Sequence, residues 1–344
     1  MAKFNILLVG CGGMGHVWIK CILQRQDCRV LGLCDIIPEK ARKMKEDYTG
    51  QGLADCAVFG NITDALAAGL GFNVVIDCTT PEAHEHVVTG ALKAGCDVLG
   101  EKPMAATREE ALNQIKTADA CGRRYSVMQN RIYLPGMRTL RKAVDDKIIG
   151  RLGFIGSSFF IGAHFGGFRD LMDNVLVLDM AIHTFYQARF IAGSNPVSVY
   201  CHEFNPPGSW YKGAANAVAI FEFENGVVYN YQGSWCAEGH NTTWECDWRL
   251  CGEVGSIKWD GKTAPVAQIV KPGATGFMRP FDEHILPLFG EDLPTSHAGC
   301  IDEMFAALNE NRPAETDCHE NYYSMNMVYG AIESAKLQKK VWLR

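Results

Sequence analysis

The sequence lacks the features of nucleic-acid-binding, membrane-spanning and secreted proteins. Its 344 residues carry no excess of positive charge, because 33 Lys and Arg stand against 39 Asp and Glu, for a net charge of -6. No apolar run approaches the ~20 residues that a membrane-spanning helix requires. The first ten residues have neither the long apolar region nor the cleavage site of a signal peptide. We therefore expect a cytoplasmic protein with no nucleic-acid partner and no membrane partner.

Cysteine is too sparse and too dispersed for a disulfide scaffold. The chain has 14 cysteines, which is about 4% of its residues, against ~8–10% in disulfide-rich secreted domains. None of them forms a C-x-x-C pair. The one local group consists of Cys236, His240, Cys246 and Cys251, and its spacings differ from those of the usual zinc sites. We expect reduced cysteines and no metal.

What is present is a pattern of apolar segments that changes near residue 130. Before it, short apolar runs such as residues 4–9 and 29–34 alternate with segments of helical spacing. This order is typical of a doubly wound parallel sheet. After it come long alternating stretches whose turns contain Gly and Asn, a strongly helical segment at residues 175–192, and two final helical segments.

These patterns predict an α/β protein of two domains. Residues 1–130 are expected to form a Rossmann dinucleotide-binding domain with a doubly wound parallel sheet. Residues 131–344 are expected to form an α+β domain with a large, mostly antiparallel open sheet, whose role would be substrate binding and oligomerisation. The last helix of the chain could pack back on the first domain.

A glycine-rich turn follows the first apolar run. Gly10, Gly12 and Gly15 form a G-x-G-x-x-G motif where a strand pattern changes into a helix pattern. In that context the first glycine permits a tight turn, the second lets the backbone approach a pyrophosphate, and the third lets helix and strand pack closely. We predict a cofactor contact along Gly10, Gly12, Gly13, Met14 and Gly15. The alternative is a glycine turn with a capping aspartate and no ligand.

Asp35 indicates which dinucleotide is bound. It lies 20 residues beyond Gly15 at the end of the second predicted strand, where a carboxylate can accept hydrogen bonds from the adenosine ribose diol. The same carboxylate would repel the 2′-phosphate of NADP, and the following Ile36, Ile37 and Pro38 supply no positive charge. The sequence therefore favours NAD over NADP.

Two later strand ends supply polar side chains to the same edge of the sheet. Thr79, Thr80 and Pro81 follow one apolar run, and Glu101 and Lys102 follow the next. Ligands of such sheets bind at the carboxyl ends of the strands, so we expect these residues on the nicotinamide side of the cofactor. The proline after Lys102 restricts this lysine to an extended backbone. The alternative is a Glu101–Lys102 ion pair in a surface loop.

Asp179 and His183 are four residues apart in an otherwise largely apolar helical segment. This spacing predicts that both face the same way. A histidine can exchange a proton near neutral pH, as oxidation of a hydroxyl to a ketone requires. A nearby ammonium such as that of Lys102 would stabilise developing alkoxide character. The alternative is an Asp–His pair with a structural role only.

Four segments together resemble one protein family. They are GCGGMG at residues 10–15, CTTPEAH at 78–84, GEKPMA at 100–105 and LDMAIH at 178–183. Their order and spacing are similar to those of the glucose–fructose oxidoreductase / inositol dehydrogenase (Gfo/Idh/MocA) family over essentially the whole chain. The resemblance implies an NAD(P)-dependent dehydrogenase acting on a CH–OH group of a sugar, inositol or related polyol. It also implies a homodimer or homotetramer formed through the C-terminal sheet.

The resemblance also implies roles for individual residues. His183 would be the general acid/base, Lys102 its electrostatic partner, and Asp179 a ligand of substrate or cofactor. His84 would be structural or lie near the cofactor. Further contacts with the substrate or the nicotinamide are expected at Asn130, Arg131, Tyr133, His164 and Arg169.

The substrate and the net reaction stay open at this point. Where the family commonly has a glycine-rich run before the catalytic helix, this chain has residues 173–176, DNVL, and that loop usually approaches the substrate. Some relatives oxidise a sugar transiently with bound NAD and thereby act as glycoside hydrolases or lyases without net cofactor turnover. A third possibility is a non-catalytic NAD-binding regulatory protein, which the joint presence of Lys102, Asp179 and His183 disfavours.

Tryptophan is concentrated in the C-terminal half. Indole rings can stack on sugar rings, but aromatic residues are also common in antiparallel strands and at interfaces. We favour a core or interface role for the five residues concerned, which are Trp210, Trp235, Trp244, Trp248 and Trp259.

Overall fold

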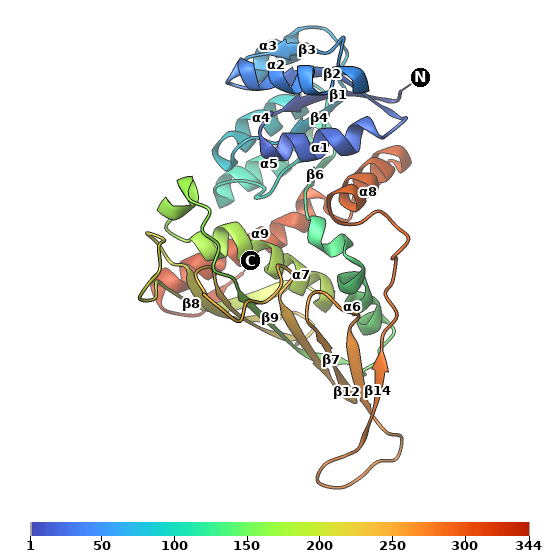
Figure 1. Cartoon of the computed structure of the whole chain (residues 1–344), viewed down its shortest axis with the longest axis vertical. Coiled ribbons are helices and arrows are strands. Elements are labelled where there is room, and N and C mark those ends of the chain that lie inside the picture. Colours follow the sequence, from blue (N-terminus) through green and yellow to red (C-terminus); the bar gives the residue numbers. More distant parts are fainter. Residues whose placement is uncertain (1, 344) are drawn as a thin grey trace. The chain divides into compact units, whose positions relative to one another are not determined.

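The computed structural model describes residues 2–343, which divide into two compact units. The first unit contains residues 2–130 and 296–322, and the second contains residues 131–295 and 323–343. Residues 296–322 group with the first unit although they follow most of the second in the sequence. Figure 1 labels many of the elements of both units.

The first unit is built on a six-stranded parallel sheet. Its strand order is β3-β2-β1-β4-β5-β6, so the chain crosses from one half of the sheet to the other between β3 and β4, beside the central β1. Ligands bind at such a switch point in open α/β sheets. The strands are β1 (Phe4–Val9), β2 (Cys28–Cys34), β3 (Ala57–Phe59), β4 (Val74–Asp77), β5 (Asp97–Gly100) and β6 (Tyr125–Val127). The predicted Rossmann sheet is confirmed.

The helices of the first unit begin where the sequence supplies caps. Asn61 accepts a hydrogen bond from the backbone of Asp64 at the start of α3, and Thr107 forms a capping box with Glu110 at the start of α5. Pro38 opens α2 in a first-turn position. The helices are α1 (Gly13–Leu23), α2 (Pro38–Asp47), α3 (Ile62–Ala67), α4 (Pro81–Lys93), α5 (Arg108–Cys121) and α8 (Ser296–Glu310), with the short 3-10 turn η1 (Thr49–Gln51). The 3-10 turn η2 (Asn130–Tyr133) begins at residue 130 of this unit and continues into the second.

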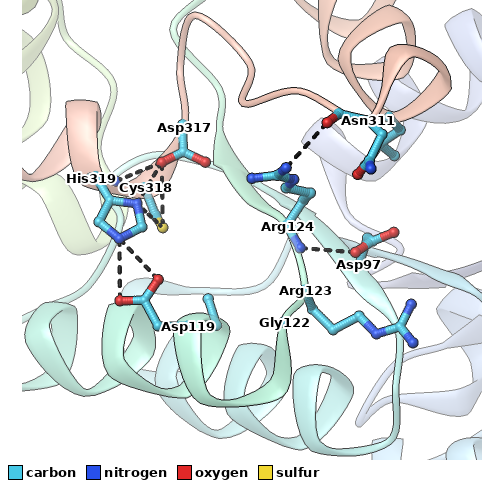
Figure 2. A pocket seen from close by; sticks show the side chains of 11 residues that line it. Asp97, Asp119, Gly122, Arg123, Arg124, Asn311, Asp317, Cys318 and His319 are labelled. Carbon is cyan, nitrogen blue, oxygen red and sulfur yellow. Dashed lines mark hydrogen bonds and ion pairs between the residues drawn. The ribbon is translucent and has the colours of Figure 1, made fainter.

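The long final helix α9 (Cys318–Leu337) starts in the first unit, against the end of α5 (Figure 2). Asp317 Oδ1 accepts a hydrogen bond from the backbone of His319 and lies 2.7 Å from its Nδ1, while Asp119 Oδ1 lies 3.1 Å from its Nε2. Burial alone would lower the pKa of His319, but the two carboxylates outweigh it and raise the pKa. The hollow at this point also contains Asp97, the first residue of β5. It therefore lies at the amino ends of the strands, opposite the edge where the cofactor motifs lie.

The second unit is built on a nine-stranded sheet. Its order is β14-β13-β12-β11-β7-β10-β9-β8-β15, and all neighbours are antiparallel except β7 and β10. The predicted mostly antiparallel sheet is confirmed. The strands are β7 (Leu152–Phe160), β8 (Pro196–Phe204), β9 (Asn216–Phe223), β10 (Val228–Ser234), β11 (Asp247–Gly252), β12 (Gly255–Trp259), β13 (Val266–Val270), β14 (Phe281–Ile285) and β15 (Val341–Trp342).

The two faces of this sheet differ in what covers them. On one face, Phe185 of α7 (Ile182–Ala192) lies 4.8 Å from Phe221 and 5.2 Å from Tyr231, measured between ring centroids. The other face is open, and its part on β8 and β9 is apolar, since Tyr200 is 47% exposed and Ile220 is 46% exposed. The remaining helical elements are α6 (Pro135–Asp145), the 3-10 turn η3 (Gly167–Leu171) and the π-helical turn η4 (Leu176–Ala181).

Candidate functional site

The turn between β1 and α1 packs directly on the turn that follows β4. Gly10 has a φ of +91°, and a Cβ there would lie 2.5 Å from the carbonyl carbon and oxygen of Cys78. A Cβ on Gly15 would overlap the carbonyl oxygen of Gly10. Both positions therefore require glycine for the fold of the turn itself.

Gly12 and Gly13 differ from these two, because a Cβ on either would meet no atom within 4 Å. Helix α1 begins at Gly13, and its N-cap, Gly12, contributes no side-chain hydrogen bond. The first N–H groups of a helix lack intrahelical partners and attract anions. A pyrophosphate therefore fits this open space, with Gly12, Gly13, Met14 and Gly15 supplying backbone donors.

Asp35 links the glycine turn to the end of β2. Its Oδ2 accepts a hydrogen bond from Cys11 N at 2.8 Å, and its Oδ1 accepts one from Ile37 N at 2.8 Å. A carboxylate has about four acceptor positions, so Asp35 keeps capacity for a ribose diol. The next residue, Ile36, is 88% exposed. The carboxylate thus stabilises the glycine turn and could also accept hydrogen bonds from an adenosine ribose.

The end of β4 carries a buried polar cluster. His84 Nδ1 lies 2.8 Å from Asp77 Oδ2, and both side chains are almost fully buried. Thr79 donates to Asp77 Oδ1 from its backbone at 3.0 Å and its hydroxyl at 2.6 Å. Burial opposes the charged imidazole, but Asp77 outweighs it and raises the pKa of His84. His84 thus anchors this turn, while Thr80 and Pro81 begin α4 as N-cap and first residue.

The end of β5 holds Glu101 and Lys102. Glu101 is 5% exposed, and its Oε1 accepts a hydrogen bond from the Trp18 indole of α1 at 2.6 Å. Its Oε2 accepts one from Lys102 N at 3.2 Å. Glu101 is therefore a buried group that links α1 to the backbone of Lys102. The sequence analysis missed Trp18, whose only signal is its position on the apolar face of a helix.

Asn130 lies just after β6, at the start of η2, and its side chain contacts the first residue of α8. Its Nδ2 donates to Ser296 Oγ at 3.2 Å. The first unit therefore brings together the glycine turn, Asp35 and Thr79, with Glu101 held on α1. Its predicted site residues lie at the carboxyl ends of β1, β2, β4, β5 and β6.

In the second unit, Asp179 and His183 lie on one continuous helical segment with an irregular start. The helix predicted over residues 175–192 is present, but residues 176–181 form the π-helical turn η4. Asp179 lies in that turn and His183 in the first turn of α7. Since a π-helix bonds residues five apart, the four-residue spacing alone does not determine whether Asp179 and His183 face the same way. Such turns are rare and frequent at functional sites.

Arg169 contacts Asp179 directly. Its Nε donates to Asp179 Oδ2 at 2.7 Å, with the two side chains 32% and 12% exposed. Arg169 comes from η3, ten residues earlier in the chain, and its guanidinium carbon lies 5.0 Å from the Phe165 ring and 4.8 Å from the Phe168 ring. Arg169, one of the predicted substrate residues in this unit, therefore contacts the helical segment that carries Asp179 and His183.

Arg131 approaches the same helix from another element. It donates to the carbonyl of Trp244 and to Met180 Sδ, and lies 3.5 Å from Glu245 Oε1. Burial raises the pKa of Glu245, and Arg131 only partly offsets this. The sequence analysis missed Glu245, which stands alone between a tryptophan and a cysteine. Its neighbour Trp244 is 44% exposed.

His164 and Tyr133, two further predicted substrate residues, each contact another side chain of the second unit. His164 is stacked on Trp210, with centroids 3.6 Å apart and planes at 17°, and its Nε2 lies 2.9 Å from Glu238 Oε1. The Tyr133 ring lies under Arg138, at 4.5 Å from its guanidinium carbon. The core interpretation of the tryptophans is confirmed for the buried Trp235, Trp248 and Trp259.

Glu203 of β8 is an acid with an unusual environment next to the loop that precedes η4. Its Oε2 accepts a hydrogen bond from Asn174 Nδ2 at 2.9 Å, and its Oε1 is buried without a hydrogen bond. Burial raises the pKa of Glu203 to about 7. Because the folded chain holds this proton more tightly than the unfolded chain, stability falls as the pH rises from about 4.5 to about 7.

We expect Glu203→Gln to stabilise the protein at pH 8 and to have little effect near pH 5. The neutral amide avoids the buried charge and can still accept from Asn174. Melting temperatures across this pH range measure the effect, which should reach several degrees at pH 8, given ~2–4 °C per kcal/mol. Glu224→Gln, at an exposed glutamate on the turn after β9, is the matched control. An equal shift of the melting temperature at pH 5 and pH 8 would contradict a raised pKa of Glu203.

Two further observations bear on the type of site. Among residues 2–343, no helix has the length and apolar character needed to cross a membrane. In the same residues, the one group of three or more His, Cys, Asp or Glu ligand atoms within 4.8 Å of one another is Asp317, Cys318 and His319, at the start of α9 rather than near the glycine turn.

Both halves of the chain match known family models. Residues 4–129 match the model of an oxidoreductase family with an NAD-binding Rossmann fold. Residues 137–258 match the model of the GFO/IDH/MocA C-terminal domain. Together the two matches cover more than half of the chain.

Individual relatives agree with these models. The chain is 26% identical to the uncharacterized protein y4oX of Sinorhizobium fredii, over 98% of this chain and 95% of that protein. It is 28% identical to the inositol 2-dehydrogenase of Rhizobium meliloti, where the alignment spans 56% of each. The solved structure of an oxidoreductase from Agrobacterium radiobacter, in complex with NAD+, L-tartaric acid and magnesium, has a TM-score of 0.86 over 99% of both chains at 17% identity. At that identity the likeness shows a shared fold.

Proposed function

The chain belongs to the Gfo/Idh/MocA family of NAD-binding oxidoreductases, and we propose that it transfers a hydride between nicotinamide and a secondary hydroxyl or ketone of a sugar, inositol or related polyol. The observation that supports this most is that the first unit has an open glycine cradle at α1 and the second unit has an acid and a histidine on the η4–α7 helix. NAD, when bound, supplies the hydride acceptor or donor.

The proposal assigns Lys102, Asp179 and His183 to one reaction. His183, which is 8% exposed, accepts the proton of the reacting hydroxyl during oxidation and returns it during reduction. Lys102 supplies a positive charge that stabilises the developing alkoxide. Asp179, held by Arg169 at 2.7 Å, orients the substrate hydroxyl. Asn130, Arg131, Tyr133 and His164 are proposed as further contacts of substrate or nicotinamide.

The direct test follows the near-ultraviolet absorbance of reduced nicotinamide. Purified protein is mixed with NAD or NADH and a panel of inositols, aldoses, ketoses and sugar acids. A change with one substrate group is expected. A flat trace with every compound, from protein that still carries tightly bound NAD, would instead point to transient oxidation without net cofactor turnover.

We further propose that NAD is preferred over NADP, because the Asp35 carboxylate lies where a 2′-phosphate would have to bind. Ile36→Arg places a positive charge next to it. Because Ile36 is 88% exposed, the change should not alter stability. We expect the KM for NADP to fall several-fold while the KM for NAD changes little. Ile36→Gln, which adds a polar but neutral side chain, is the control, and an equal effect of both variants would contradict a charge effect.

The open face of the nine-stranded sheet is proposed to join two or four copies of the chain. It carries exposed Tyr200, Val218 and Ile220 on neighbouring strands, and contiguous apolar patches of this kind mark interfaces. Light scattering should give a dimer or tetramer, and Ile220→Lys should give a smaller species. The proposed compartment of the protein is the cytoplasm, and cell fractionation tests this.

A further inference from the structure

Three side chains contact the guanidinium of Arg169. Its Nε is bonded to Asp179 at 2.7 Å, and the Phe165 and Phe168 rings lie 5.0 Å and 4.8 Å from the guanidinium carbon. Phe165 in turn lies 5.5 Å from the buried Trp235 ring. A guanidinium in contact with aromatic rings loses less freedom when it binds a ligand, because cation–π contacts already restrict it.

Only part of this guanidinium is used within the protein. Arginine has five N–H donors in a rigid fork, and Nε–H is taken by Asp179. In the described residues, no acceptor receives a hydrogen bond from Nη1 or Nη2 of Arg169. The side chain is 32% exposed, so these donors are open to a ligand. The flanking rings are also open, with Phe165 48% exposed and Phe168 66% exposed.

We propose that Arg169 binds a carboxylate of the substrate, so that the protein acts on an acidic sugar or polyol such as an aldonic or uronic acid. This inference rests on the proposed function, because it places the substrate hydroxyl at Asp179 and His183. The free edge of the fork matches a carboxylate in bidentate geometry. Since the same guanidinium contacts Asp179, the carboxylate belongs on a carbon close to the reacting one.

The alternative is that the site prefers a positively charged substrate, because two carboxylates lie next to Arg169. Asp170, next to Arg169, has a buried Oδ1 without a hydrogen bond, and Asp179 is an acceptor for an ammonium as well as for a guanidinium. An amino sugar would therefore use the carboxylates instead of the arginine. The anion is favoured because an ammonium would have to compete with Arg169 for Asp179, whereas a carboxylate uses donors that are idle.

The first test compares compounds that differ at one carbon only. The NADH-loaded protein is titrated, with tryptophan fluorescence as the readout, with the aldonate, the alditol and the 1-amino-1-deoxyalditol of the gluco, galacto and manno series, and with glucuronate against glucose. For at least one skeleton the acid should bind about 30-fold more tightly than its neutral counterpart, as expected for a charge-assisted pair. Equal binding of acid and neutral compound throughout, or tighter binding of the amine, overturns the proposal.

The second test assigns the preference to Arg169. In Arg169→Gln the ratio of acid to neutral affinity should fall close to one, whatever happens to the absolute rate through Asp179. Arg151→Gln, at a highly exposed arginine paired with Glu253, should keep the ratio. A preference for the acid that survives in Arg169→Gln overturns the proposal.

The two proposals fail differently. If the proposed function is wrong, no compound changes the absorbance of the nicotinamide, although an acid can still bind in an Arg169-dependent way. If only the inference is wrong, hydride transfer occurs with neutral compounds as readily as with acids, and Arg169→Gln leaves their ratio unchanged.

Discussion

Replacing His183 with alanine is expected to lower kcat by about 10²–10⁴-fold, the usual contribution of a positioned proton-transfer group. Loss of the imidazole leaves the reacting hydroxyl without a proton acceptor, so the pH dependence of kcat should lose its step near neutral pH. The affinity for NAD should change little, because the glycine cradle and Asp35 belong to the other unit of the chain. Steady-state rates and a fluorescence titration with NAD measure the two effects separately.

The control for this variant is His86→Ala. His86 is an exposed residue of α4, so its replacement tests whether the loss of a histidine by itself lowers kcat. We expect its kcat to equal that of the unchanged protein. Unchanged turnover in His183→Ala would remove this residue from the mechanism and leave the acid of the same helix, Asp179, as the remaining candidate.

The fold of the first unit follows from the sequence because its strands are buried on both faces. Such strands appear as continuous apolar runs, and residues 6–8 of β1 are fully buried. The edge strands of the second sheet were harder to predict from the sequence. Every residue of β14 is exposed and β15 has two residues, so neither shows the alternation by which a strand is recognised. Pairing with a neighbour, rather than any local pattern, defines them.

The candidate site divides in the same way. The glycine turn and Asp35 were predictable because each acts through its own backbone context within one βαβ unit. The contact between Trp18 and Glu101 joins residues 83 apart, and that between Arg169 and Asp179 joins a loop to a helix. The π-helical geometry of η4 likewise leaves no mark in the spacing of apolar residues. These features depend on tertiary packing, which residue order alone does not give.

The second large effect is expected for Gly12→Ala, which should weaken NAD binding at least about tenfold while the protein stays folded. Gly12 has a φ of -84° and a ψ of -162°, which alanine also adopts, and a Cβ there meets no atom within 4 Å. The added methyl group would instead occupy the space that a pyrophosphate needs. Alanine is a poorer N-cap than glycine, so a stability loss of about 1 kcal/mol or less is included.

Three other glycines separate this effect from ordinary folding effects. Gly90→Ala, in the interior of α4 where a Cβ also meets nothing within 4 Å, should raise stability by about 0.5–1 kcal/mol and leave NAD affinity unchanged. Gly10→Ala and Gly15→Ala should lower the melting temperature, because their Cβ atoms overlap backbone. If Gly12→Ala binds NAD as well as Gly90→Ala does, the open space beside Gly12 is not a pyrophosphate site. The expected result is a lower affinity of Gly12→Ala for NAD with a melting temperature close to that of the original protein. The added methyl group would then oppose the ligand rather than the fold of the turn, because Gly10 and Gly15 are the glycines that the fold requires.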